Sequence, residues 1–247
     1  TQTQPLEENF LIRRIAEFWK DGDLNIVKSQ ILEFLSMYPE SYKKDDCLGI
    51  LGEIYFKEGL YEEALGSYEK ITSPSVSQKI SINKLQSYYQ LDHFAKIIEE
   101  GRALLRQNVH FDNEKKEQFN FLMAEAFFKE ALSEKDKGIR QDYSRQAKNY
   151  YNKLVQAEYL STYELTLPEI YYILEDYRLA TQTYRELAHK YSDMQEELLF
   201  RAASIQALYS KEEASQSFKE IKDKNGEKAQ EATFNLMILL FQSEEYQ

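Results

Sequence analysis

The sequence predicts an all-α fold built from repeated helical hairpins, and three observations lead to this prediction. The chain of 247 residues holds only 8 Gly and 4 Pro, against many Glu, Lys, Leu and Ala, which favours helices over a turn-rich β fold. Hydrophobic residues make up 43%, which is enough for a packed core. A triplet of one small and two larger apolar residues at positions i, i+4 and i+7 recurs along the chain, and this spacing places its members on one helical face.

The triplets follow one another at nearly regular intervals. The clearest is Ala64-Tyr68-Ile71, in the stretch LGEIYFKEGLYEEALGSYEKI, where Tyr61 to Ile71 read as a second helix. The others are Val27-Ile31-Phe34, Ile97-Gly101-Leu104, Ala147-Tyr151-Leu154, Ala180-Tyr184-Leu187 and Ala214-Phe218-Ile221. Their first members are 37, 33, 50, 33 and 34 residues apart. Because a lone pair of short helices buries too little apolar surface to be stable, the copies are expected to stack on one another.

With this period and this code of small and large residues, the chain resembles the tetratricopeptide repeat (TPR) family over nearly its whole length. The resemblance implies a right-handed superhelical solenoid of about six helix–turn–helix repeats plus a C-terminal helix. The predicted repeats cover residues 6–39, 45–74, 77–108, 115–158, 161–192 and 195–224, and the final helix covers 227–243. No partner helix follows that last one, so it is predicted to be either a capping helix or the cut end of a longer array. Of the two, we expect the array to be a fragment of a longer chain.

The first three repeats have recognisable turns. Gly22 in KDGDL and Gly59 in KEGLY are predicted to join the two helices of the first and second repeats, and Leu91-Asp92-His93 those of the third. Ser73-Pro74 is expected to end the second repeat. Gly101 stands where the other repeats carry a large residue, which is expected to weaken that helix contact.

The fourth repeat carries an insertion. Its core positions Phe127 and Ala147 lie 20 residues apart, against 9 from Tyr55 to Ala64 in the second repeat, so 11 residues are added. Since 11 residues make about three helical turns, we expect a longer hairpin that bends near Gly138. The alternative is a flexible, solvated loop.

The fifth repeat has Pro168 where the pattern has a small residue inside the first helix. Proline in a helix interior removes a hydrogen bond and clashes with the preceding turn, but it is tolerated in a first turn. The helix is therefore predicted to begin near Leu167, with Ser161 to Thr166 as connecting chain.

Charge and composition exclude several classes of partner. With a net charge of −11 and a pI of about 5.0, the surface is unsuited to nucleic acid and to anionic membranes. No apolar run approaches the ~20 residues needed to insert directly into a membrane. The start, TQTQPLEENF, carries no targeting segment, so a cytoplasmic and a periplasmic location both stay open.

Signals for catalysis and cofactors are missing from the sequence. Cys47 is the only cysteine, which excludes an intrachain disulfide and a cysteine zinc site. The three histidines, His93, His110 and His189, have no regular spacing to other ligands. No glycine-rich phosphate loop and no G-x-S-x-G elbow occurs. We therefore predict that the chain is not an enzyme and that it needs no metal or cofactor.

The resemblance also implies where a partner would bind, because TPR ligands commonly contact the first helix of each repeat. The position after the last core residue of that helix reads Trp19, Phe56, Tyr89, Phe128, Tyr172, Gln206 and Phe241, of which six are aromatic. Family members that clamp a carboxylate carry asparagine at a position that here includes Glu53, Glu125 and Glu169, so this function is not predicted. We interpret the six aromatic and three acidic residues as a groove for an apolar segment or amphipathic helix of a protein partner. The alternative is that the aromatics fill the inside of a tight superhelix.

Two further hypotheses concern the role of such a scaffold. LGEIYFKEGLYEEA is similar to the repeats of periplasmic Tol-Pal coordination proteins and of β-barrel assembly lipoproteins, which implies a bacterial cell-envelope protein acting in complex assembly. The C-terminal segment from Leu236 to Phe241 is apolar on all sides, which would suit a homodimer through the C-terminal helix. Its alternative is burial against the next repeat of a longer chain.

Overall fold

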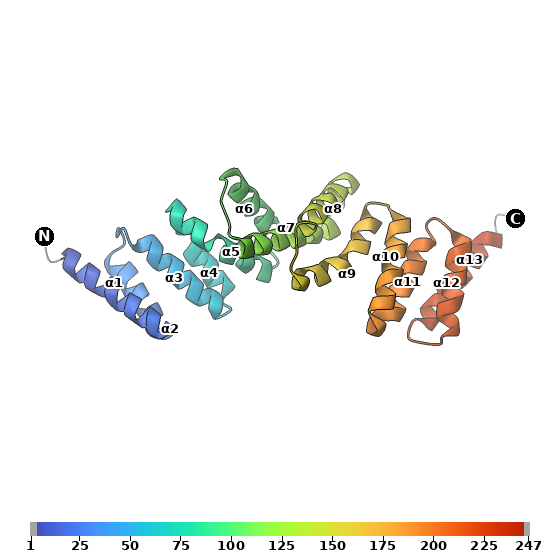
Figure 1. Cartoon of the computed structure of the whole chain (residues 1–247), viewed down its shortest axis with the longest axis horizontal. Coiled ribbons are helices and arrows are strands. Elements are labelled where there is room, and N and C mark those ends of the chain that lie inside the picture. Colours follow the sequence, from blue (N-terminus) through green and yellow to red (C-terminus); the bar gives the residue numbers. More distant parts are fainter. Residues whose placement is uncertain (1–3, 245–247) are drawn as a thin grey trace. The chain divides into compact units, whose positions relative to one another are not determined.

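The structure, a computed structural model, describes residues 4–244, and these form thirteen α-helices, one 3-10 turn and no strand (Figure 1). The chain divides into two compact units, residues 1–126 and 127–247, and we describe each by itself. The division falls inside helix α7. The prediction of an all-α helical-repeat fold is confirmed.

Both units consist of helices that follow one another through short turns. Unit 1 contains α1 (Gln4–Asp21), α2 (Leu24–Met37), α3 (Lys44–Lys57), α4 (Tyr61–Tyr68), α5 (Pro74–Gln90), α6 (Phe94–Arg106) and most of α7 (Asn113–Ser133). Unit 2 contains the end of α7, α8 (Lys137–Tyr151), α9 (Ala157–Ile173), α10 (Tyr177–Lys190), a 3-10 turn (Ser192–Met194), α11 (Gln195–Gln206), α12 (Lys211–Asp223) and α13 (Ala229–Glu244). Consecutive helices pack on each other from α1 to α6 in unit 1 and from α8 to α13 in unit 2. None of these helices, over residues 4–244, is long and apolar enough to cross a membrane.

The six triplets form the core, as their helical spacing predicts. All eighteen residues are buried except Ile71 and Leu104, which are half-buried. In unit 1, Val27, Ile31 and Phe34 have no exposed surface and pack in one cluster with Leu51 and Ile54 of the next hairpin. The triplet therefore joins each repeat to its neighbour, which is what makes stacking stabilise short helices.

Two glycines let helices approach closely, but with different neighbours. A methyl group added to Gly52 on α3 would lie 2.3 Å from Cε1 of Tyr68, whose ring fills the space over the glycine. A methyl group on Gly101 would lie 2.2 Å from Sδ of Met123 on α7. The expectation of a weak contact at Gly101 is therefore wrong, because the Met123 thioether occupies the space that the missing side chain leaves.

Four of the hairpin turns place one residue in the left-handed backbone region. Gly22 and Gly59, both predicted turn residues, have φ of +78° and +76°. Asp92 and Glu175 take the same role in α5/α6 and α9/α10, with φ of +56° and +63°. A left-handed backbone is unfavourable for a residue with a Cβ, so only two of these four turns use the residue best suited to them.

Helix α4 ends earlier than its apolar pattern predicts. Ile71 lies outside the helix, half-buried against Ala64 and Tyr68. The Asp45 carboxylate explains this, because its Oδ2 accepts hydrogen bonds from the backbone N–H groups of Thr72 (3.0 Å) and Ser73 (2.5 Å). These bonds hold the segment before α5 in a non-helical conformation. Helix α5 then begins at Pro74, a first-turn position that suits proline.

Replacing Asp45 by alanine is expected to lower the free energy of unfolding of unit 1 by about 1–3 kcal/mol, since hydrogen bonds to charged groups contribute this much. Burial opposes ionisation of Asp45, but the bonds from Ser73 and Thr72 outweigh it, so its pKa lies below its ordinary value. A lowered pKa stabilises the fold at neutral pH, and this contribution is lost as the pH falls through the folded-state pKa. Urea unfolding at neutral and acid pH would test this.

The matched control is Asp46→Ala, in the same first helical turn, where only an exposed ion pair with Lys43 is lost. An equal loss of stability in both variants at neutral pH, or a loss from Asp45→Ala that persists unchanged in acid, would contradict the assignment.

Helix α9 corrects the prediction for the fifth repeat. It begins at Ala157, so Ser161 to Thr166 are helical and the buried Pro168 lies inside the helix rather than in its first turn. Tertiary contacts hold the part before the proline: the Tyr163 ring stacks on Tyr151 of α8 at 4.8 Å and 10°. The Tyr163 hydroxyl also donates to Oδ1 of Asn152 (2.7 Å). This packing outweighs the hydrogen bond that proline cannot make.

The insertion of the fourth repeat lies in two long helices, α7 of 21 residues and α8 of 15. The bend expected at Gly138 is instead at residues 134–136, because Asp136 caps α8 through a hydrogen bond from the Ile139 N–H to its Oδ1 (2.9 Å). Gly138 therefore lies in the first turn of α8.

The C-terminal helix α13 is apolar on two different faces. Leu236 and Leu239 are 6% exposed and pack with Phe218 of α12, whereas Met237 and Phe241 are 56% and 64% exposed. The predicted open end is therefore half core and half surface.

Candidate functional site

In unit 1 the predicted groove aromatics lie against the hairpin turns. Trp19, Phe56 and Tyr89 are half-buried. The Phe56 ring meets the ring of Tyr61 edge-on at 5.7 Å, and Tyr89 meets Phe94 at 6.0 Å, so each contacts the first residue of the following helix. Trp19 lies under the ammonium group of Lys57, 4.9 Å from its ring. These contacts make Phe56 and Tyr89 packing residues of their own hairpins and place Trp19 against the end of α3. Only part of each ring stays accessible.

The two predicted acidic residues of unit 1 also have partners inside the fold. Glu53 forms an ion pair with Lys57 one turn later (3.0 Å). Glu125 is 5% exposed, and its Oε2 accepts a hydrogen bond from the Tyr89 hydroxyl (3.3 Å). Burial and the Glu125 charge raise the pKa of Tyr89 to about 12, so this tyrosine stays a donor at neutral pH.

In unit 2 the predicted residues divide between core and surface. Phe128 is buried, with 8% of its surface exposed. Tyr172 is 40% and Phe241 64% exposed. Glu169 is half-buried, and its Oε2 accepts a hydrogen bond from the Tyr184 hydroxyl (2.9 Å). Of the nine predicted residues, the structure brings Glu169 and Tyr172 together in one cavity.

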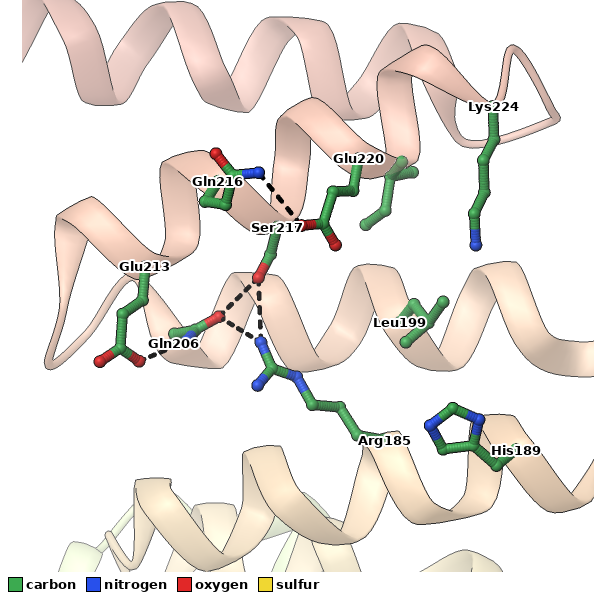
Figure 2. Close-up of a pocket in the computed structure, with 10 residues that line it drawn as sticks. Arg185, His189, Leu199, Gln206, Glu213, Gln216, Ser217, Glu220 and Lys224 are labelled. Atoms are coloured by element: carbon green, nitrogen blue, oxygen red, sulfur yellow. Dashed lines mark hydrogen bonds between the residues drawn. The ribbon is translucent and has the colours of Figure 1, made fainter.

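Gln206 is the one non-aromatic residue among the seven that follow the last core residue of each repeat's first helix, a set that we call the aromatic column. It is 1% exposed and organises a polar cluster between α10, α11 and α12 (Figure 2). Its Oε1 accepts hydrogen bonds from Nη2 of Arg185 (2.9 Å) and from the hydroxyl of Ser217 (2.8 Å). Its Nε2 donates to Oε2 of Glu213 (2.7 Å). A buried amide must find such partners, and an aromatic ring at this position would remove one hydrogen-bond partner from each of the three residues.

The cavity that contains Tyr172 and Glu169 lies on the other side of α11 and has a volume of about 340 Å³. We call it the α9–α13 cavity. It is lined by Glu169, Tyr172, Tyr184, Glu197, Phe200, Arg201, Ser204, Ile205, Leu208, Lys228 and Glu231. Carboxylates and apolar side chains therefore share one concave surface.

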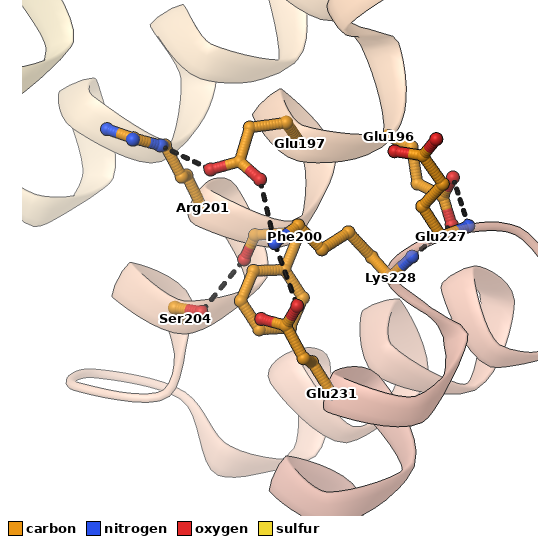
Figure 3. Close-up of polar contacts among 8 residues, drawn as sticks. All are labelled: Glu196, Glu197, Phe200, Arg201, Ser204, Glu227, Lys228 and Glu231. Atoms are coloured by element: carbon orange, nitrogen blue, oxygen red, sulfur yellow. Dashed lines mark hydrogen bonds and ion pairs between the residues drawn. The ribbon is translucent and has the colours of Figure 1, made fainter.

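An ion-pair chain crosses this cavity (Figure 3). Glu197 lies between Nε of Arg201 (2.9 Å) and Nζ of Lys228 (3.0 Å), and Lys228 also contacts Glu231 (2.8 Å). The hydrogen bond from Arg201, followed by that from Lys228, outweighs burial and keeps the pKa of Glu197 below its ordinary value. The Lys228 ammonium lies 5.4 Å from the centre of the Phe200 ring, which fixes the aromatic wall of the cavity.

Glu196, the residue before Glu197, fixes the start of α13. Its carboxylate accepts hydrogen bonds from the backbone N–H groups of Glu227 (3.0 Å) and Lys228 (3.0 Å). Gly226 makes room for it, because a methyl group there would lie 2.3 Å from Oε2 of Glu196. Asp45 binds the start of α5 in the same way, so a carboxylate in the first turn of one helix anchors the loop before a later one in both units.

Most of these contacts were not predicted from the sequence. Arg185 and Lys228 carry no regular spacing that marks them, because Arg185 contacts Gln206 and Lys228 contacts Glu197, both on α11. Arg201 lies one helical turn after its partner Glu197, a spacing that is common on helix surfaces. Gln206 alone gave a signal, as the one polar residue in a column of aromatics. Within residues 4–244 no group of three potential metal ligands occurs. Burial raises the pKa of the Cys47 thiol to about 12, which leaves it protonated at neutral pH.

Comparison with known proteins gives similarity at the level of solved structures. No family model matches the chain, and no curated protein sequence matches it. A tetratricopeptide repeat protein from Parabacteroides merdae ATCC 43184 is 18% identical, with 94% of this chain and 98% of that one covered and a TM-score of 0.40. The TPR domain of P58(IPK) is 14% identical, with 98% and 67% covered and a TM-score of 0.42. By its own helix pairs and buried triplets, the chain is an all-α helical-repeat protein that is similar to tetratricopeptide repeat proteins.

Proposed function

We propose that the chain is a non-catalytic protein-interaction module and that unit 2 binds an amphipathic segment of a partner protein in the α9–α13 cavity. The observation that carries this proposal is the exposure of large apolar side chains in a concave, acidic setting. Tyr172 and Leu208 are 40% and 55% exposed and share the cavity with Glu169, Glu197 and Glu231. Partly exposed aromatic residues in concave surfaces are typical anchors of protein interfaces.

The apolar surface continues along α13, which would give a helical partner room for more than one turn. A second cavity of about 360 Å³ shares Phe200 and Glu231 with the first and adds Phe234, which is 60% exposed. An amphipathic helix presents apolar side chains at intervals of three and four residues and could place them in both cavities.

Charge favours a basic partner. Both cations of the α9–α13 cavity, Arg201 and Lys228, already contact Glu197, so they are not available to bind acidic groups without breaking an ion pair. The chain as a whole carries −11 charges. Lysine or arginine beside the apolar residues of the partner would therefore speed association and be preferred over glutamate.

Fluorescence anisotropy with two labelled peptides tests this function. Both peptides carry leucine at the same helical spacing, and they differ only in lysine or glutamate on the polar face. We expect the lysine peptide to bind at least about tenfold more tightly, since a charge preference of about 1.4 kcal/mol has this effect. Tyr172→Ala should weaken its binding about tenfold, because truncated aromatic anchors typically lose more than about 1 kcal/mol.

The matched control is Tyr42→Ala, which removes a 77% exposed tyrosine from unit 1 and should leave binding unchanged. Equal weakening by Tyr42→Ala would contradict the assigned cavity, and equal binding of the two peptides would contradict the basic partner.

Self-association is a second candidate, favoured by the exposed face of α13, where Phe234, Met237 and Phe241 are each more than half exposed. Analytical ultracentrifugation of the wild type and of Phe241→Ser would separate it from the first. A dimer that dissociates in the variant supports this role, and a monomer at all concentrations excludes it. A cell-envelope role stays a hypothesis on the resemblance of the second repeat.

A further inference from the structure

A third cavity of unit 2, on the α12 side of α11, has no role in the function proposed above. Its volume is about 570 Å³. It is lined by Arg185, His189, Leu199, Gln206, Glu213, Gln216, Ser217, Glu220, Ile221 and Lys224. We call it the Arg185 cavity. It differs from the α9–α13 cavity in the state of its cations.

Arg185 is held in place by neutral groups. Its Nη2 donates to Oε1 of Gln206 (2.9 Å) and to the hydroxyl of Ser217 (3.0 Å), and Gln206 is itself 1% exposed and fixed by further bonds. The guanidinium is thus oriented while its charge is not neutralised by a carboxylate in the part of the chain that the structure describes. An oriented arginine with free donors is well suited to a planar, charged oxygen pair.

Two more cationic or potentially cationic side chains point into the same space (Figure 2). His189 lies four residues after Arg185 on α10 and so shares its helix face. Lys224 extends from the end of α12 toward His189. Over residues 4–244, neither forms an ion pair.

The two acidic residues of this cavity accept hydrogen bonds from neutral side-chain amides. Glu213 accepts from Nε2 of Gln206 (2.7 Å), and Glu220 accepts from Nε2 of Gln216 (3.1 Å). In Figure 2 the Glu213 carboxylate lies at the end of the cavity opposite His189 and Lys224, while Leu199 lies beside the histidine. The cationic end of the cavity therefore has an apolar wall, and the Glu220 carboxylate lies between this end and Glu213.

We propose that the Arg185 cavity binds a small ligand that carries a carboxylate or phosphate group on a short apolar body. The oxyanion contacts Arg185, His189 and Lys224, and the apolar body lies against Leu199 and Ile221. The buried Gln206 is the positioning residue, because it orients the arginine without cancelling its charge. A volume of this size is typical of small-molecule sites.

Titration followed by NMR of the 15N-labelled protein tests the proposal with three probes. N-acetyl-leucine carries a carboxylate and an apolar body, N-acetyl-leucinamide carries the same body without the charge, and inorganic phosphate carries the charge without the body. We expect N-acetyl-leucine to shift the amides around Arg185 and Lys224 and to bind at least about tenfold more tightly than the amide. Binding of phosphate to the same amides would point to a phosphate-bearing ligand, and its failure to bind would point to a carboxylate.

Lys224→Gln should weaken the binding of N-acetyl-leucine severalfold, and Lys219→Gln, the same charge change at an exposed site on α12 outside the cavity, should not. Gln206→Met should weaken it as well, while circular dichroism checks that the fold survives. Equal binding of N-acetyl-leucine and its amide, no shift with any probe, or equal effects of the two lysine variants would overturn the proposal. None of these outcomes depends on Tyr172, so they are separate from the test of the protein-binding function.

Discussion

Replacing Tyr151 by alanine is expected to lower the free energy of unfolding of unit 2 by about 3–5 kcal/mol, the usual range for removing a large buried ring. Tyr151 has no exposed surface and belongs to the fourth core triplet. Its ring also stacks on Tyr163 and thereby holds the part of α9 that precedes Pro168. Since the proline interrupts the hydrogen-bond ladder, residues 157–167 depend on this contact more than an ordinary helix would.

Hydrogen exchange distinguishes this local effect from general destabilisation. In Tyr151→Ala the amides of residues 157–167 should exchange faster than those of α11 and α12, because the helix loses its anchor as well as the unit losing stability. Tyr151→Phe is the matched control, since it keeps the stacked ring. A uniform increase of exchange across unit 2, or an equal effect of both variants on α9, would show that the stack does not anchor this segment.

Replacing Gly52 by alanine is expected to destabilise unit 1 by about 2 kcal/mol. The added methyl group would lie 2.3, 2.6 and 2.9 Å from three atoms of the Tyr68 ring, which is 2% exposed and cannot move aside without disturbing its neighbours. Overpacking of this kind typically costs ~1–3 kcal/mol, and the gain in helix propensity offsets up to about 1 kcal/mol. Urea unfolding followed by circular dichroism measures the difference.

Gly66→Ala is the control for the helix-propensity term. Gly66 is an exposed residue of α4 with no atom within 4 Å of an added methyl group, so alanine should stabilise unit 1 by about 0.5–1 kcal/mol. The two alanines, one in each helix of the same hairpin, are therefore expected to change stability in opposite directions. If Gly52→Ala also stabilised the unit, the close approach of α3 and the Tyr68 ring would be wrong.

The helices and the core could be predicted because burial repeats along the sequence. The core position that Ala64 occupies recurs about 34 residues later at the same spacing within its triplet, so periodicity alone identifies it. The predictions at Gly101 and Pro168 are wrong because a residue far away in the sequence makes the contact that a nearby residue makes in the other repeats. Met123 fills the space at Gly101 although it lies 22 residues away in the sequence. Tyr151 stacks on Tyr163 and so stabilises the part of α9 that precedes Pro168. Neither contact can be recognised from the spacing of nearby residues.

The candidate site was less predictable for a related reason. The aromatic column identified a structural position, but its members differ in exposure from 8% at Phe128 to 64% at Phe241, because each repeat packs different residues against it. Glu197 and Lys228 are 31 residues apart in the sequence and meet only once α11 and α13 are in place. Sequence reasoning thus located one edge of the α9–α13 cavity, through Glu169 and Tyr172, and missed the charged chain across it.

The thioether at Gly101 has a consequence for oxidative damage. Met123 has no exposed surface, and its sulfur fills the notch over the glycine so closely that a sulfoxide oxygen would have no room there. Peroxide can therefore reach this sulfur only when the fold opens locally, as it would if α6 and α7 separated. Once formed, the polar sulfoxide would keep α6 and α7 from packing closely again. A brief opening of this helix pair would therefore leave a stable modification at Met123.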